Sequence, residues 1–434
     1  MDFHSTRGQA PPVALPQALV QGLAPDGGLY MPSSVPVFSR ARVSELATAE
    51  WPEGASLVLD ALLSGAMAPD DLDDLVSDAL DFPVPLVRIH DRLWILELFR
   101  GPTLAFKDVG ARFMARLLVH FLGDEDRPVT VLTATSGDTG GAVAHAFHGL
   151  PGVRVVVLFP DGKVTPRQER QFSTLGGNIT AVAVQGDFDD CQRMAKEAFR
   201  ERPDSGPDGS LLTSANSINV GRFLPQTTYF WEAWARLNER IQNRTNILFC
   251  VPSGNFGNLA AGLLAKAMGL PGCSFLAATN ENDVVPEYLD SGRFRPRPSV
   301  RTHSTAMDVG DPSNLQRILH LYSGDIDSLR NDLIGRRVSD PETLDCIRRV
   351  RDSFGYILDP HTAVGFHALE QELGSRPDSV GVLLATAHPA KFAEVVEPVL
   401  AEQLPIPPEL SGCMERERKV VRAEPILDAI RHLL

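Results

Sequence analysis

Cysteine is scarce in this sequence, and the few that occur are not spaced for a structural role. Five cysteines are spread over 434 residues without a Cys-x-x-Cys pair or a Cys/His cluster. An odd and scattered set excludes a disulfide framework and a zinc site of the usual spacing. We therefore expect no metal, and a reducing compartment.

Long apolar runs are absent as well. No stretch approaches the roughly 20 apolar residues that a membrane-spanning helix needs. The opening residues MDFHSTRGQAPPV also lack the basic start and the apolar core of a signal peptide. The sequence thus predicts a cytoplasmic protein without a membrane partner.

Positive charge is in deficit, with 41 Lys and Arg against 55 Asp and Glu and a formal net charge of -14. This balance disfavours binding to nucleic acid, although a local basic pocket for a small anion remains compatible with it. The Walker motif, the GxGxxG dinucleotide motif and the GxSxG elbow are missing too. A small molecule is therefore the expected partner.

What the sequence does contain is the alternation of an α/β protein. Residues 1 to about 90 carry helical patterns at 43–49, 55–63 and 70–79. From Leu93 on, short apolar runs rich in β-branched residues each precede a helical stretch, which predicts a parallel sheet covered by helices. The expected strands are 129–135, 153–159, 178–184, 246–252, 273–279 and 380–386, and polar loops are expected at 202–210 and 290–299. A chain of 434 residues also predicts two or three domains.

A lysine stands at a predicted helix start in 99-FRGPTLAFKDVG-110, where a Gly-Pro turn precedes Lys107. The helix dipole and burial both disfavour a charged amine there, and a neutral amine is what Schiff-base chemistry requires. The same pattern would also fit a lysine that enters a helix and simply faces solvent. Lys107 is the candidate nucleophile.

Two glycine-rich turns follow predicted strands and open helices. In 133-TATSGDTGGAVAHAF-147, backbone N–H groups and the hydroxyls of Ser136 and Thr139 suit a carboxylate. In 251-VPSGNFGNLAAGLLAKAMGLP-271, main-chain amides from Ser253 to Asn258 can converge on a phosphate. The turn at 133–147 could alternatively be a purely structural device, since glycine and hydroxyl residues are common at such positions.

Two further segments hold candidate binding groups. The stretch 213-TSANSINVGRFLPQ-226 joins Ser214, Asn216, Ser217 and Asn219 to Arg222, and one arginine among uncharged donors suits a phosphate dianion. An ordinary Asn/Ser-rich helix cap is the alternative. In 383-LLATAHPAKFAEV-395, Thr386 ends a strand and could hydrogen-bond an unprotonated pyridine nitrogen, with His388 and Lys391 after it.

Two other histidines are not assigned a functional role. His303 and His361 have no carboxylate or second histidine at metal-ligand spacing, so they are interpreted as loop and helix-cap residues.

Together these segments resemble the threonine synthases, which are fold-type-II enzymes dependent on pyridoxal phosphate. The resemblance is nearly collinear over the chain, and GPTLAFKD followed about thirty residues later by TATSGDTG is its most specific part. It continues through HSTRG, QALVQGLAPDGGLYMP, SANSINVGR, VPSGNFGN, AATNENDVVP, AMDVGDPSN, DPHTAVGFHAL and ATAHPAKF.

The resemblance implies two open twisted sheets with flanking helices, as in the tryptophan synthase beta-like fold, plus an N-terminal helical region. The expected domains are 1–90 as the accessory helical region, 91–225 as the smaller α/β domain and 226–434 as the larger one. The smaller domain would carry Lys107 and the larger one the cofactor-phosphate loop. The resemblance further implies a carbon–oxygen lyase that turns O-phospho-L-homoserine and water into L-threonine and phosphate.

Residue roles follow from the same resemblance. Lys107 would hold pyridoxal 5'-phosphate covalently, and its freed amine would move protons at Cα and Cβ. Cofactor contacts would come from Asp138, Ser253, Gly254, Asn255, Phe256, Gly257, Asn258 and Thr386, with Asp138 replacing an asparagine common in other fold-type-II enzymes and facing the 3'-oxygen. Substrate contacts would come from Thr135, Ser136, Gly137, Thr139, Asn216, Ser217, Asn219 and Arg222.

Other functions stay open at this point. A related phospho-lyase would release a 2-oxo acid, a serine/threonine dehydratase would not need the SANSINVGR cluster, and a catalytically silent paralogue would bind anions without turnover. The resemblance favours a monomer over a homodimer.

Overall fold

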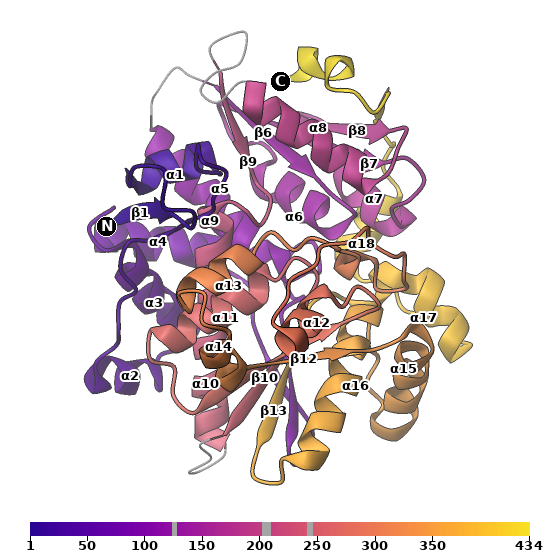
Figure 1. The fold of residues 1–434 in the computed structure, drawn as a ribbon. Helices are drawn as coiled ribbons and strands as arrows, with labels where there is room; N and C mark the ends of the chain where they lie inside the picture. Colours follow the sequence, from indigo (N-terminus) through magenta and orange to yellow (C-terminus); the bar gives the residue numbers. More distant parts are fainter. Residues whose placement is uncertain (124–127, 202–209, 241–245) are drawn as a thin grey trace.

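Two mainly parallel sheets, each covered by helices, make up most of the fold (Figure 1). The computed structural model describes residues 1–123, 128–201, 210–240 and 246–434. The loop expected at 202–210 lies almost wholly outside the described residues. Among the described residues, no helix is long and apolar enough to cross a membrane, and no three His, Cys, Asp or Glu side chains are grouped to hold a metal ion.

The larger sheet has six strands in the order β12–β11–β10–β13–β5–β4. All neighbours are parallel except β4, which is antiparallel to β5. The strands are β4 (Leu86–His90), β5 (Leu93–Glu97), β10 (Ile247–Pro252), β11 (Cys273–Thr279), β12 (Leu333–Arg337) and β13 (Val380–Ala385).

The smaller sheet has five strands in the order β14–β8–β7–β6–β9, and all of its pairs are parallel. Its strands are β6 (Val129–Ala134), β7 (Val153–Pro160), β8 (Ile179–Val184), β9 (Leu211–Ser214) and β14 (Val421–Ala423). Each of the six strands expected from the sequence is present, because a strand buried on both faces is written as a continuous apolar run.

Alternating residues of the central strands serve two different cores. In β10, Phe249 and Val251 pack into the cluster on one face of the larger sheet, whereas Leu248 and Cys250 pack into the cluster on the other face. Side chains of a strand point alternately to opposite faces, so one apolar run supplies both cores. The smaller sheet is enclosed in the same way.

Helices cover both faces of each sheet (Figure 1). Those that follow the smaller sheet's strands or flank it are α5 (Lys107–Leu122), α6 (Asp138–Phe147), α7 (Pro166–Ser173), α8 (Phe188–Glu201) and α9 (Val220–Phe223). Around the larger sheet lie α10 (Thr228–Arg240), α11 (Gly257–Ala267), α12 (Val284–Ser291), α13 (Leu315–Leu321), α14 (Ile326–Asp332), α15 (Asp340–Phe354), α16 (Pro360–Ser375) and α17 (Ala393–Leu400). Short 3-10 turns are η1 (Leu224–Thr227), η2 (Thr305–Met307) and η3 (Pro389–Phe392).

The N-terminal region contains the expected helices together with a feature that the sequence did not predict. Its helices are α1 (Leu15–Gln21), α2 (Arg40–Leu46), α3 (Glu53–Leu63) and α4 (Pro69–Ala79). The addition is an antiparallel sheet in the order β2–β1–β3, formed by β1 (Asp2–Ser5), β2 (Val13–Ala14) and β3 (Tyr30–Pro32). Strands this short leave little periodicity to detect.

The chain crosses between the sheets more than once. Strand β5, which the expected division groups with residues 91–225, pairs with β13 of the larger sheet, and β14 returns to the edge of the smaller sheet. The tail after α17 forms α18 (Pro408–Met414), β14, η4 (Leu427–Ala429) and η5 (Arg431–Leu433). The three-domain division stays a prediction, and on this topology both α/β domains are discontinuous in sequence.

Candidate active site

A pocket of about 140 Å³ lies where strands of both sheets end. The loop after β6 borders it on the side of the smaller sheet. The ends of β10 and β13 border it on the side of the larger sheet. Ligand sites of open α/β sheets lie at these carboxyl ends. Of the residues expected from the sequence, it is lined by Lys107, Thr135, Ser136, Asp138, Thr139, Asn216, Ser217, Arg222, Ser253, Gly254, Asn255, Phe256, Gly257, Asn258 and Thr386, whereas Gly137 and Asn219 do not line it.

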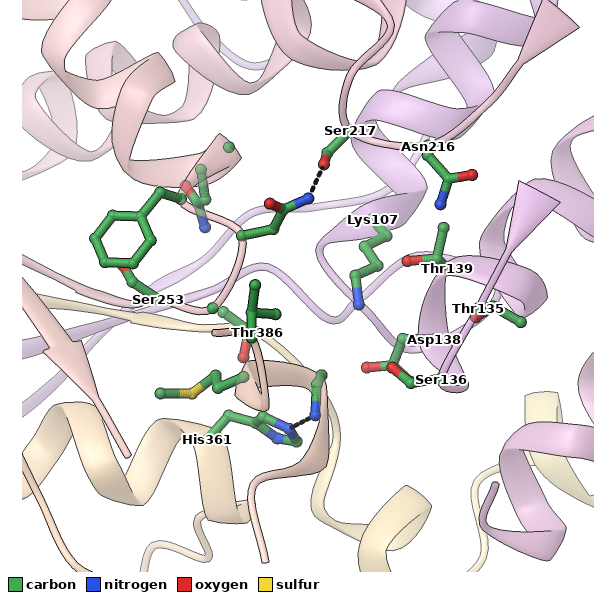
Figure 2. A pocket seen from close by; sticks show the side chains of 18 of the residues that line it. Lys107, Thr135, Ser136, Asp138, Thr139, Asn216, Ser217, Ser253, His361 and Thr386 are labelled. Carbon is green, nitrogen blue, oxygen red and sulfur yellow. Dashed lines mark hydrogen bonds between the residues drawn. The ribbon is translucent and has the colours of Figure 1, made fainter. Parts of the chain in front are cut away.

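Lys107 is the first residue of α5 and points into this pocket (Figure 2). The preceding residue is tied to the end of β13, because the Phe106 N–H donates to the Thr386 carbonyl at 2.9 Å. Burial lowers the pKa of Lys107 to about 8, the Asp138 carboxylate opposes this shift, and the cations Lys391 and Arg222 add to it. At pH 7 about a tenth of the amine is therefore neutral, and nucleophilic attack requires this form.

The turn before Lys107 is held by Asp108. This buried carboxylate accepts a hydrogen bond from the Thr103 N–H at 2.8 Å and another from the Thr103 hydroxyl. A Cβ at Gly101 would lie 2.6 Å from an Asp108 oxygen, so the turn needs glycine there. Asp108 thus fixes the backbone that presents its neighbour Lys107.

The loop between β6 and α6 is shaped by Thr135. Its hydroxyl oxygen accepts hydrogen bonds from the N–H groups of Gly137 (2.9 Å) and Gly140 (2.8 Å). Gly137 has φ of 144°, a conformation that favours glycine, and turns away from the pocket against Gln168. Ser136 and Thr139 remain at the pocket surface (Figure 2).

Asp138 begins α6 and is a fixed carboxylate. It lies 2.7 Å from the Lys391 ammonium and accepts a hydrogen bond from the Gln168 amide at 2.8 Å. Burial alone would raise its pKa, but the charges of Lys391 and Lys107 and these hydrogen bonds hold the pKa well below its usual range. The pocket therefore contains an ionised acid beside the reactive lysine.

The turn from Ser253 to Asn258 opens α11 and has the features of an anion cradle. Phe256 adopts a left-handed conformation with φ of 61°, and no side chain caps the first turn of the helix. The first N–H groups of a helix have no partner within it, and the first residues of α11, Gly257 and Asn258, line the pocket. A Cβ at Gly254 would come within 2.6 Å of the Met307 backbone, so the close approach of these two segments requires glycine.

Two asparagines complete this cradle. Asn255 donates to the Ser217 hydroxyl at 2.8 Å and accepts from the Ser313 N–H at 2.7 Å, which joins the cradle to the SANSINVGR segment (Figure 2). The Asn258 amide oxygen accepts from Tyr229 at 2.6 Å, while its buried amide nitrogen has no partner among the described residues. Uncapped N–H groups and an unused amide donor fit the phosphate group of a cofactor.

Arg222 brings positive charge to the opposite part of the pocket. It is 3% exposed, it donates to the Ala215 carbonyl, and its Nε has no partner among the described residues. Burial lowers its pKa to about 10, against the pull of Asp108, so it stays charged at neutral pH. Asn219 instead accepts from the Gly221 N–H at 2.9 Å and caps α9, the short helix that carries Arg222.

Three pocket or near-pocket residues were missed as functional groups. His361 was interpreted as a helix-cap residue, yet it lines the pocket, bonded at Nδ1 to Asp359 (2.8 Å) and at Nε2 to the Ala306 N–H (3.1 Å). Asp308 also lines the pocket, and burial raises its pKa to about 6. Lys391 is fully buried against Asp138. Of the three, only His361 had a signal in the sequence, the motif DPH before an apolar helix. An aspartate at a helix start can hydrogen-bond to the histidine two residues later and fix its side chain.

Comparisons with known proteins agree with this architecture. The sequence matches the family described as pyridoxal-phosphate dependent enzyme over residues 81–386, threonine synthase N terminus over 2–80 and threonine synthase, C-terminal over 362–434. Threonine synthase of Escherichia coli (strain K12) is 44% identical over 411 residues, which cover 95% of this chain and 94% of that protein. Threonine synthase of Schizosaccharomyces pombe is 32% identical and covers 100% of this chain and 98% of its own length.

Solved structures agree over the same length. The crystal structure of threonine synthase from Escherichia coli superposes with a TM-score of 0.92 at 43% identity, covering 100% of this chain and 99% of that one. Pyridoxal-phosphate-bound threonine synthase from Brucella melitensis gives 0.91 at 33% identity, covering 100% and 98%. The resemblance seen in the motifs and the expected fold class are both confirmed. The chain belongs to the threonine synthase family of pyridoxal-phosphate-dependent enzymes.

Proposed function

We propose that this chain converts O-phospho-L-homoserine and water into L-threonine and phosphate. The observation that carries the proposal is one pocket that combines a partly buried lysine of lowered pKa with two separate anion sites. One anion site is the turn Ser253 to Asn258, which suits the cofactor phosphate. The other surrounds Arg222, which suits the phosphate of the substrate.

The cofactor would be held at three places. Lys107 would bind its aldehyde carbon, the cradle Ser253 to Asn258 its phosphate, and Thr386, which lies across the pocket from Asp138 (Figure 2), its pyridine nitrogen. When bound, pyridoxal phosphate supplies an electron sink for bonds broken at the substrate amino carbon.

The substrate would lie between the two sheets. The loop Thr135 to Thr139 would hold its carboxylate through the backbone N–H groups and the hydroxyls of Ser136 and Thr139. Asn216, Ser217 and Arg222 would hold its phosphate. Asn219 would act indirectly by capping the helix of Arg222, since it lies outside the pocket.

Lys107 would also move the protons. Displaced by the substrate amine, its Nζ would take a proton from Cα, act at Cβ and return a proton at the end of the turnover. Phosphate leaves from Cγ, and water adds at Cβ. Asp108 would support these transfers indirectly, because its hydrogen bonds to Thr103 fix the turn that presents Lys107.

Product analysis tests the proposal. The purified protein supplied with pyridoxal phosphate and O-phospho-L-homoserine is expected to release equal amounts of threonine and phosphate. Release of 2-oxobutyrate with phosphate would instead identify a phospho-lyase. Turnover of serine or threonine alone would identify a dehydratase, and a protein without a borohydride-sensitive cofactor band would be a silent paralogue. The cytoplasmic location and the monomeric state stay predictions.

The Gly254→Ala variant is expected to weaken pyridoxal phosphate binding by about 10- to 100-fold. The added methyl would meet the Met307 Cα at 2.6 Å and the Ala306 carbonyl at 2.8 Å, both backbone atoms, so the cradle itself must move. Titration of the cofactor-free protein with pyridoxal phosphate, followed by absorbance, measures the change in affinity.

Gly374→Ala is the matched control, because no atom lies within 4 Å of the Cβ that it would add. Its cofactor affinity should equal that of the wild type. Equal affinity in the Gly254 variant would show that this turn does not hold the phosphate.

A further inference from the structure

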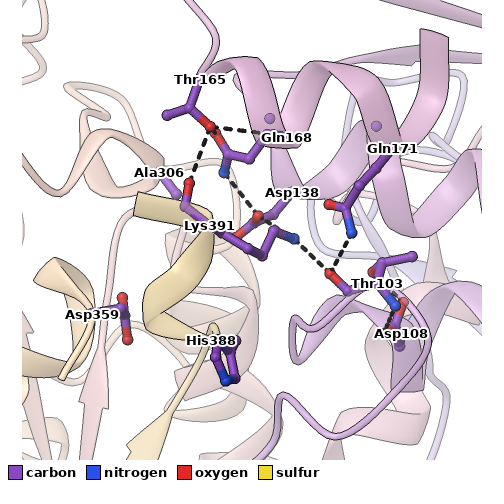
Figure 3. A network of polar contacts seen from close by, with 12 residues as sticks. Thr103, Asp108, Asp138, Thr165, Gln168, Gln171, Ala306, Asp359, His388 and Lys391 are labelled. Carbon is purple, nitrogen blue, oxygen red and sulfur yellow. Dashed lines mark hydrogen bonds and ion pairs between the residues drawn. The ribbon is translucent and has the colours of Figure 1, made fainter. Parts of the chain in front are cut away.

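A buried ion pair between Lys391 and Asp138 joins the regions of the two sheets (Figure 3). Lys391 lies on η3, after the last strand of the larger sheet, and Asp138 lies at the start of α6 in the smaller-sheet region. Their charged atoms are 2.7 Å apart, and the side chains are 0% and 4% exposed. Lys391 takes no part in the proposed binding contacts or proton transfers.

The position of Lys391 is fixed from both ends. Its ammonium also donates to the Thr103 carbonyl at 2.7 Å, and its own carbonyl accepts from the Thr165 hydroxyl at 3.2 Å. Gln171 donates to the same Thr103 carbonyl at 3.0 Å, and Thr103 in turn bonds to Asp108 (Figure 3). The cation is thus built into the turn that presents Lys107.

Three charged side chains act on the Lys107 amine, and Lys391 is one of them. Asp138 faces Lys107 from α6, Arg222 from α9 and Lys391 from η3. His145 and His388 lie near Lys391, but burial lowers the pKa of each to about 4, so they are neutral. Without Lys391, Asp138 would be a buried carboxylate without its ion-pair partner, and its charge would favour a protonated Lys107.

We propose that Lys391 is a positioning residue that pairs with Asp138 and cancels its charge, so that Lys107 is not held as an ammonium ion bound to Asp138. This inference deepens the proposed function and rests on it. A neutral side chain at position 138 would need no such partner. An aspartate there requires a second, permanent cation, and Lys391 supplies it.

A double-mutant cycle read by spectroscopy tests the inference. The pH dependence of the bound cofactor's absorbance, measured between about pH 6 and 10, reports the proton affinity of the Lys107 nitrogen. Lys391→Met is expected to raise that affinity by about 10- to 100-fold, because Asp138 is left unpaired. Asp138→Asn is expected to lower it, because Lys391 is left unpaired. The double variant is expected to return within about threefold of the wild type.

Lys266 provides the matched control. Its ammonium also contacts one aspartate, Asp332 at 2.7 Å, and one backbone carbonyl, that of Cys273 at 2.6 Å, but it does not line the pocket. Lys266→Met should leave the absorbance titration unchanged. A shift equal to that of Lys391→Met would show a general effect of losing a lysine and would overturn the inference.

The remaining outcomes are separable. If Lys391→Met does not fold, the double variant compared with Asp138→Asn must still show the higher proton affinity, and equal values overturn the inference. Shifts of the same sign in both single variants also overturn it, because a merely structural role would produce them. A wild-type protein without a borohydride-sensitive band contradicts the proposed function itself.

Discussion

The Lys107→Ala variant is expected to form threonine at least about 10³-fold more slowly than the wild type and to lack covalently held cofactor. The pocket contains no second amine in an equivalent position, since Lys391 is engaged by Asp138 and the Thr103 carbonyl and does not line the pocket. Without Lys107, none of the described pocket residues would supply an amine to bind the aldehyde or to transfer the protons. Absorbance, threonine release and mass spectrometry after borohydride trapping measure these losses.

Lys196 serves as the control for this experiment. It is exposed on α8 outside the pocket, so Lys196→Ala should retain the cofactor band and full turnover. After trapping, the wild type should carry a pyridoxyl group on Lys107. A label on any other lysine would contradict the assignment.

Arg317→Met is expected to lower the free energy of unfolding by about 3 to 5 kcal/mol. Arg317 is fully buried, and no carboxylate among the described residues shifts its pKa, which burial alone lowers to about 9. Its guanidinium donates to the carbonyls of Ser217 (2.8 Å) and Ile218 (2.7 Å) and to that of Tyr30, and it lies 4.3 Å from the Phe223 ring centroid. Methionine fills a similar volume but leaves these carbonyls buried without donors.

Urea unfolding at fixed cofactor concentration measures this loss. Arg348→Met is the control, because Arg348 is exposed and lies 3.8 Å from Asp345, a surface pair that contributes at most about 1 kcal/mol. Equal midpoints for the two variants would show that the carbonyls around Arg317 find other partners. Arg317 also holds the segment of Ser217, so the variant should bind substrate more weakly.

The sequence predicted most of the buried strands because each is a local property. A strand such as β10 is covered on both faces, so its apolar run is continuous and visible without knowledge of its partners. Pairing was not predictable in the same way. The contact of β5 with β13 joins residues almost 300 positions apart, and no local pattern specifies it. The short strands of the N-terminal sheet fell below the length at which periodicity is informative.

In the candidate site too, the residues that could be predicted are those whose role follows from a local motif. Lys107 and the turn Ser253 to Asn258 carry their chemistry within one motif, so sequence reasoning could assign them a role that the pocket supports. Asn219 belongs to a polar cluster in the sequence, but the direction of its side chain depends on the helix start that it caps. The pairing of Lys391 with Asp138 and the contact of His361 with Ala306 join distant segments, so no local pattern indicates them.

The final strand of the smaller sheet has a consequence for biosynthesis. Strand β14 comes after all the segments of the larger sheet and lies against the open side of β8. A ribosome releasing the chain from its N-terminus therefore exposes the backbone of β8 throughout most of translation, and any shortened form ending before Val421 leaves that backbone uncovered. Uncovered strand edges pair readily with other chains, so we expect truncated copies to aggregate more readily than the full chain.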